Sequence, residues 1–84
     1  MQITLCARSK ILNLLDEGKV FRIQRTECGE AGSHVDLIPN AELAAFDCII
    51  SHVPLVVADL FTATHMASQY IDFDYQSGEF LISI

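Results

Sequence analysis

The last fifteen residues constrain the fold of this chain more than any other stretch. They form two alternating runs, residues 70–75 and 79–84, on either side of a Ser77-Gly78 pair. Alternation of apolar and polar residues around a glycine-containing turn predicts a β-hairpin. With a two-residue loop, three cross-strand pairs share one face of this hairpin: Tyr75 with Phe80, Phe73 with Ile82, and Ile71 with Ile84. This apolar face needs a second layer, because an isolated hairpin is marginal in water.

The other face of the predicted hairpin carries three carboxylates, Asp72, Asp74 and Glu79. A slip of one residue between the two strands would bring these carboxylates into the core. The alternation therefore fixes which face is buried. The hairpin is expected to present a negatively charged outer surface.

The charged residues are distributed unevenly along the chain. All five basic residues lie within the first 25 positions, together with two acidic ones, and the remaining 59 positions hold nine carboxylates and no Lys or Arg. These counts give the net charge of −6. Nucleic-acid binding depends on neutralising phosphates with Lys and Arg, so most of this molecule is unsuited to it. A protein with a basic surface is a better-matched partner.

The length of 84 residues predicts a single domain, residues 1–84. No apolar run approaches the roughly 18 residues of a membrane span, and the N-terminus lacks the basic and apolar segments of a signal peptide. Three cysteines without close spacing, Cys6, Cys28 and Cys48, argue against a disulfide framework. We therefore expect a cytoplasmic protein without a membrane partner.

Periodicity and turn residues predict the secondary structure of the rest of the chain. Strands are expected at residues 2–6, 19–26, 70–75 and 79–84, and helices at 9–17, 41–52 and 54–69. Ser9 is the expected N-cap of the first helix, and Pro54 the first-turn residue of the last. The pattern predicts a small two-layer α+β domain, with a mixed sheet of about four strands and two or three helices. Residues 46–51 also read as a buried strand, and that alternative would make the fold α/β.

The expected core collects apolar residues that recur at strand or helix spacing. Its members are Leu5, Leu15, Phe21, Ile23, Phe46, Ile50, Leu60, Phe61, Phe73 and Ile82. The order of the strands is not encoded in this pattern.

The first candidate for chemistry is Cys6-Ala7-Arg8-Ser9. A cysteine between a strand and a helix occupies the position in which thioredoxin-like folds place a reactive thiol. Arg8, Lys10 and a helix N-terminus would favour its thiolate. The segment has no second cysteine in a Cys-x-x-Cys arrangement, however, and this favours a small buried cysteine that fills a gap in the core.

Other patterns that indicate catalysis or metal binding are not found in the sequence. Structural zinc sites usually draw ligands from closely spaced pairs. No such pair occurs among the candidate ligands, which are Cys28, His34, Cys48, His52 and His65. Ser51 precedes His52, but neither a nucleophile elbow nor a phosphate-binding glycine loop surrounds them. We expect no enzyme activity, no cofactor and no metal site.

Together these features favour a small acidic, non-enzymatic protein-interaction module that inhibits or regulates a partner protein with a basic surface. The residues expected to contact this partner are Asp59, Asp72, Asp74 and Glu79. Two alternatives stay open. One is a cytosolic thiol-redox protein that uses Cys6, and the other is a structural homodimer in which the last strand pairs with its copy.

Overall fold

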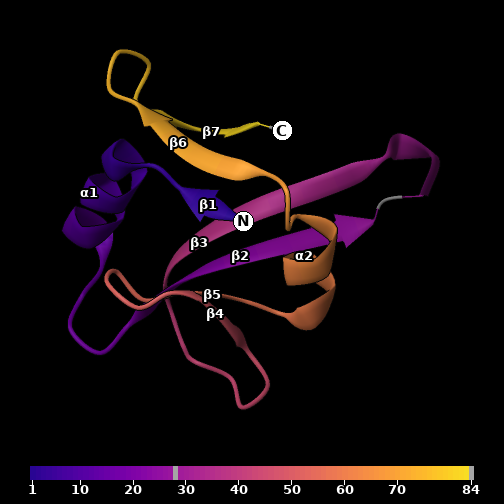
Figure 1. Cartoon of the computed structure of the whole chain (residues 1–84), viewed down its shortest axis with the longest axis horizontal. Coiled ribbons are helices and arrows are strands. Elements are labelled where there is room, and N and C mark those ends of the chain that lie inside the picture. The colour runs from indigo at the N-terminus through magenta and orange to yellow at the C-terminus, as the bar shows by residue number, and fades with distance from the viewer. Residues whose placement is uncertain (28, 84) are drawn as a thin grey trace.

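Two β-sheets and two α-helices make up the part of the chain that the structure, a computed structural model, describes: residues 1–27 and 29–83. In chain order the elements are β1 (Gln2–Ile3), α1 (Leu5–Leu14), β2 (Val20–Glu27), a 3-10 turn (Gly29–Ala31), β3 (Ser33–Ala41), β4 (Cys48–Ser51), β5 (Val56–Ala58), α2 (Leu60–His65), β6 (Tyr70–Asp74) and β7 (Glu79–Ser83). In Figure 1, α1 lies at the left of the view and α2 lies right of its centre. This arrangement confirms the small two-layer α+β domain.

The strands divide between two sheets, where the sequence analysis expects one. The three-stranded sheet has the order β1-β6-β7, with β1 parallel and β7 antiparallel to β6. The four-stranded sheet has the order β3-β2-β5-β4, with β2 and β5 parallel. The apolar faces of the two sheets pack against each other. The rings of Phe21 on β2 and Phe80 on β7 are in contact there, with their centroids 5.6 Å apart.

The core between the sheets contains part of the expected set. Phe21, Ile23 and Phe73 are buried, as predicted. Several expected residues pack against this core while staying partly exposed: Leu15, Ile50 and Ile82. Buried residues that the prediction omitted include Ile3, Ala7, Ile11, Val56, Ala58, Met66 and Ile71.

Three of the expected core residues are exposed. Leu5, Phe46 and Leu60 have 84%, 94% and 69% of their surface accessible. Leu5 and Leu60 are the first residues of their helices, and Phe46 lies in a turn before β4. The prediction for these three was wrong. Leu5 and Leu60 begin helices that start at residues other than those expected, and Phe46 lies in a turn where a helix was expected. Phe61 is half-buried and its ring packs edge-on against His65.

The first helix begins four residues earlier than expected. Thr4 is its N-cap, and the Thr4 Oγ1 atom accepts a hydrogen bond from the Ala7 N–H at 3.2 Å. Threonine is a favoured N-cap because its hydroxyl satisfies one of the free N–H groups of the first turn. The strand before the helix is shortened to two residues, and the expected cap Ser9 lies inside the helix.

The two later helices predicted from periodicity were largely wrong. Residues 48–51 form β4, as in the alternative that reads 46–51 as a strand, although the fold remains α+β. Pro54 lies in a turn after a cis Val53-Pro54 peptide bond and does not start a helix. The short helix α2 begins only after Asp59, whose carboxylate accepts the Thr62 N–H at 2.7 Å.

The C-terminal hairpin exists, but its register differs by two residues from the expected one. Asp74 pairs with Glu79, Phe73 with Phe80, Asp72 with Leu81, and Ile71 with Ile82. The loop is four residues long because the Asp74 carbonyl accepts the Gly78 N–H at 2.8 Å and the Asp74 carboxylate accepts the Gln76 N–H at 2.9 Å. A shift of two residues preserves the buried face. Ile84, the expected partner of Ile71, lies outside the described residues.

The contrast between two phenylalanines tests this assignment of the core. We expect Phe73→Ala to lower the free energy of unfolding by about 3–4 kcal/mol, because it removes a buried ring. We expect Phe46→Ala to change it by less than about 0.5 kcal/mol, because that ring is exposed. Urea unfolding of both variants measures the difference. Equal losses in the two variants would contradict the packing described here.

Candidate interaction surface

All five basic side chains are engaged within the fold. Arg8 on α1 donates from Nη1 to Ser51 Oγ at 2.7 Å and from Nε to the Ile3 carbonyl at 3.1 Å, so it joins the helix to both sheets. Lys10 places its ammonium 5.3 Å from the centre of the Phe73 ring, a cation–π contact. These two cations therefore serve contacts between elements.

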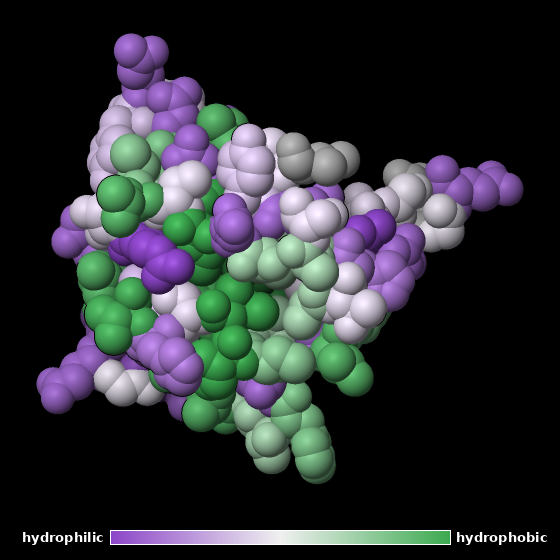
Figure 2. Space-filling view, in the orientation of Figure 1, coloured by the Kyte–Doolittle hydropathy of each residue, from purple (hydrophilic) through white to green (hydrophobic). Residues whose placement is uncertain are grey.

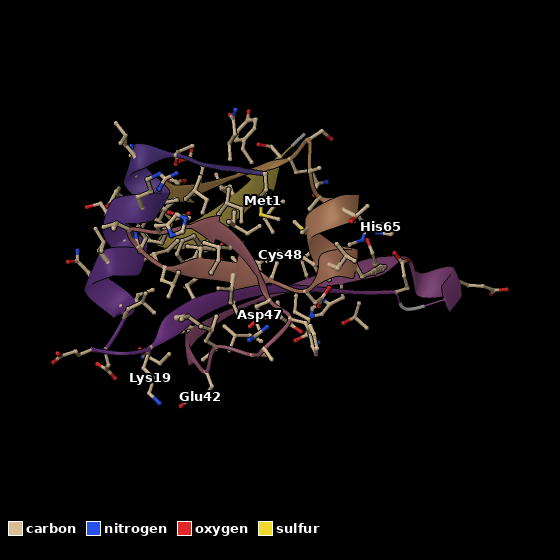
Figure 3. All side chains as sticks on the ribbon, turned by 60° about the horizontal axis from the view of Figure 1, so that its bottom comes forward. Met1, Lys19, Glu42, Asp47, Cys48 and His65 are labelled. Carbon is tan, nitrogen blue, oxygen red and sulfur yellow. The ribbon has the colours of Figure 1, made fainter. Side chains whose placement is uncertain are left out.

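The other three basic residues form ion pairs with carboxylates. Lys19 pairs with Glu42, and Figure 3 shows the two side chains next to each other. Arg25 Nε lies 3.3 Å from Glu27 Oε1, although the two groups are not aligned as a hydrogen bond. The third pair, Arg22 with Asp47, is the most buried one.

The Arg22–Asp47 pair fixes the loop of residues 42–47 on the outer face of the four-stranded sheet. Arg22 donates to both carboxylate oxygens of Asp47, at 2.7 and 2.6 Å, and to the Glu42 carbonyl at 2.7 Å. The side chains of Arg22 and Asp47 are only 18% and 4% exposed. Val57, the neighbour of Arg22 on β5, is fully buried on this face.

Hydrogen bonding within this pair shifts both ionisation equilibria. The bond from Arg22 holds the pKa of Asp47 below its usual range, against the opposing effect of burial. The same bond raises the pKa of Arg22. No local pattern marks the pair in the sequence, because its members are 25 positions apart, and the sequence analysis missed it.

Eight of the eleven carboxylates have no Lys or Arg partner among the described residues. They are Asp16, Glu17, Glu30, Asp36, Asp59, Asp72, Asp74 and Glu79. Within this set, Asp36 Oδ1 lies 2.7 Å from Nε2 of His34. The net charge of −6 therefore comes from these carboxylates, which have no Lys or Arg partner among the described residues.

Two carboxylates face each other at the end of the hairpin. Asp74 on β6 and Glu79 on β7 are directly paired, Glu79 exposed and Asp74 half-buried. Like charges in opposite positions of a sheet repel each other. Together with Asp72, which lies on the same face, we call them the acidic hairpin. The turn end of this hairpin projects at the top of Figure 1.

Asp72 has a structural role within the acidic hairpin. Its Oδ1 atom accepts the Thr4 hydroxyl at 2.6 Å and the Phe73 N–H at 2.8 Å. The bond from Thr4, followed by that from Phe73, lowers the pKa of the Asp72 carboxyl. Asp72 thus joins β6 to the N-cap of α1 through two internal donors, whereas Asp74 accepts one, the Gln76 N–H of its own loop.

The fourth predicted partner residue, Asp59, belongs to a different part of the molecule. It caps α2, and its charge acts on Arg22 of the four-stranded sheet. In Figure 1, α2 and the turn of the hairpin lie toward opposite ends of the view. The structure therefore gathers three of the four predicted partner residues on one hairpin and leaves Asp59 apart.

Some of the exposed apolar side chains lie on the helices and the hairpin, and others lie on the four-stranded sheet and the loop before β4. Leu43, Phe46 and Ile49 are all exposed there. Figure 2 shows hydrophobic side chains across the centre and lower part of the face, and hydrophilic ones at its projecting corners. This apolar region and the acidic hairpin belong to different sheets.

The two described cysteines, Cys6 and Cys48, lie on different elements, α1 and β4. Cys6 is exposed and lies in the first turn of α1, not in a strand. The Tyr75 hydroxyl donates to the Cys6 carbonyl at 3.4 Å. Cys48 is half-buried on β4, opposite Ala58. Cys28 lies outside the described residues. Within residues 1–27 and 29–83 no three Cys, His, Asp or Glu side chains are grouped as metal ligands.

Comparison with known proteins identifies a structural likeness but no family. No family model matches the chain, and no curated protein matches it either. A solved structure described as IscA with the [2Fe-2S] cluster superposes with a TM-score of 0.75 and 19% sequence identity. The match covers 96% of this chain and 81% of that one. At this identity the likeness shows a shared fold.

In the described residues, no helix has the length and apolar character needed to cross a membrane. The longer of the two helices, α1, has ten residues.

The Arg22–Asp47 pair makes a prediction about stability and pH. We expect Asp47→Asn to lower the free energy of unfolding at neutral pH by about 2 kcal/mol, because it leaves a half-buried guanidinium without its charged acceptor. A carboxyl whose pKa is lowered by folding stabilises the protein above its unfolded pKa of about 3.9, and this contribution disappears as the pH falls through the folded pKa. The difference between wild type and variant should therefore shrink between neutral pH and pH about 2.

Urea unfolding at several pH values measures this difference. Glu17→Gln is the matched control, since Glu17 is exposed and outside the ion pairs of the described residues. A loss in Asp47→Asn that is independent of pH would show that the charge of Asp47 does not contribute.

Proposed function

We propose that this chain is a small acidic, non-enzymatic protein-interaction module that binds a basic surface of a partner protein in the cytoplasm and thereby inhibits or regulates that partner. The observation that supports this proposal is the distribution of charge contacts. Every Lys and Arg is engaged within the fold, and eight carboxylates are left without such a partner in the described residues. A cationic partner can therefore bind these carboxylates without displacing a Lys or Arg of this chain.

The acidic hairpin is the proposed centre of binding. Asp74 and Glu79 repel each other in the free protein, because they are paired across the strands. A Lys or Arg of the partner placed near both carboxylates would add two attractions that offset this repulsion. Charge complementarity of this kind accelerates encounter and weakens as salt screens the charges. Asp72 adds to the negative electrostatic potential of the acidic hairpin while its Oδ1 atom stays hydrogen-bonded to the Thr4 hydroxyl.

The shared fold raises the question of an iron–sulfur cluster, which the IscA structure contains. Such clusters are held by cysteine thiolates. The two described cysteines, Cys6 and Cys48, lie on α1 and β4, and no third ligand joins either of them within residues 1–27 and 29–83. The described residues do not fit a cluster, and the proposed function includes no cluster chemistry.

Two charge variants test the proposal with a defined cationic probe. The probe is a fluorescent peptide of four Lys alternating with four Gly, which carries charge without a preference for a strand. We expect Asp74→Lys/Glu79→Lys to weaken binding about tenfold at low salt, which corresponds to about 1.4 kcal/mol. The control Asp16→Lys/Glu17→Lys reaches the same net charge, starting from −6, at residues outside the hairpin.

Fluorescence anisotropy at increasing salt provides the measurement, and circular dichroism verifies that both variants are folded. Equal weakening in the two double variants would mean that only total charge matters, which contradicts a site at the hairpin. Absence of binding to the wild-type protein at low salt would contradict the proposed function as a whole.

A further inference from the structure

The last strand, β7, is an edge of its sheet. The order β1-β6-β7 gives β7 a single strand neighbour, β6, among the described residues. In an antiparallel pair, alternate residues of an edge strand direct their N–H and C=O groups away from the neighbour. None of the residues of β7 is fully buried. The backbone of β7 therefore offers unpaired donors and acceptors at an accessible edge.

The other sheet edges carry breaks or residues that discourage pairing, whereas β7 has only the charge of Glu79. β3 contains Pro39 and has Asn40 at a φ of 57°. β4 has a break in its register between Ile49 and Ser51, and β1 is only two residues long. β7 keeps an unbroken register over five residues and contains neither Pro nor Lys. Natural sheets use prolines, bulges, short strands and lysines to protect edges, so the exposed edge of β7 is unusual in this fold.

The side chains of β7 define what an added strand must carry. Phe80 and Ile82 contact the core but remain half-buried. Apolar side chains beside them would extend the core outward. On the opposite face, Glu79 and Leu81 are exposed, and Glu79 faces Asp74 without a cation between them. A Lys or Arg beside Glu79 would offset one of the two negative charges of this pair.

A second copy of this chain is a poor occupant of that edge. Its own β7 carries no basic residue, and no Lys or Arg follows Arg25 anywhere in the sequence. Pairing two copies through β7 would bring two acidic hairpins together without a cation from either. Charge complementarity therefore selects a partner whose strand is basic.

Building on the proposed function, we infer that the partner contributes an extended segment of alternating apolar and basic residues, which adds to the edge of β7 as a fourth strand of the three-stranded sheet. Main-chain hydrogen bonds to β7 supply affinity, and alternate side chains supply specificity. The apolar residues lie beside Phe80 and Ile82, and the basic ones share the face of Glu79, with Asp74 one strand further in on β6.

Three peptides of equal charge separate strand addition from charge attraction. The first alternates four Lys with four Val, the second has the same sequence with every backbone N–H replaced by N–CH3, and the third is the Lys-Gly peptide described above. We expect the first to bind at least about tenfold more tightly than the other two. It should also slow hydrogen exchange of the β7 amides that point away from β6.

The outcomes distinguish the two proposals. If all three peptides bind equally and Asp74→Lys/Glu79→Lys weakens each, the acidic module stands and strand addition is overturned. If none binds at low salt, both are overturned. If light scattering shows a dimer whose β7 amides are protected without peptide, the edge is filled by a second copy and the inference fails.

Discussion

The packing of three phenylalanines joins the two sheets, and the orientation of the hairpin depends on it. Phe21 belongs to the four-stranded sheet, whereas Phe73 and Phe80 face each other across the hairpin. The ring centroids of Phe80 lie 5.6 Å from Phe21 and 4.9 Å from Phe73. In a chain of 84 residues the core is small, and these rings lie where the two sheets meet within it. Because these rings point inward, the carboxylates between them in sequence point outward.

The basic residues compensate for the small core by connecting elements that share little apolar contact. Arg8 joins α1 to the end of β4, and Arg22 holds the loop of residues 42–47 over Val57. Long cationic side chains suit this task because one guanidinium reaches several acceptors at once. Their engagement has a consequence for the surface: the cations are turned toward the fold, and the acidic residues dominate what a partner meets. Stability and the proposed recognition thus depend on the same distribution of charge.

Sequence patterns predicted the α+β class, the existence of the hairpin and its buried face, but not the loop length. Alternation specifies that Phe73 faces inward. A register shift of two residues keeps Phe73 on the same face, so alternation cannot distinguish a two-residue loop from a four-residue loop. The loop was decided by Asp74, which accepts hydrogen bonds from Gln76 and Gly78. The predicted helix at residues 54–69 failed for another reason. Val56, Val57 and Ala58 are all fully buried in β5, so this strand lacks the alternation by which strands are found.

The sequence by itself determined the excess of carboxylates after residue 25 and the outward position of those on the hairpin, because composition and alternation are local properties. Only the tertiary structure decided which carboxylates are available to a partner. Asp47 is occupied by Arg22, Asp72 by Thr4 from 68 positions away, and Asp59 by the first turn of α2. Asp74, which accepts one N–H of its own loop, and Glu79 face each other beside an open strand edge. Hydrogen bonds and ion pairs depend on distances in space, and the spacing of residues along the chain does not encode those distances.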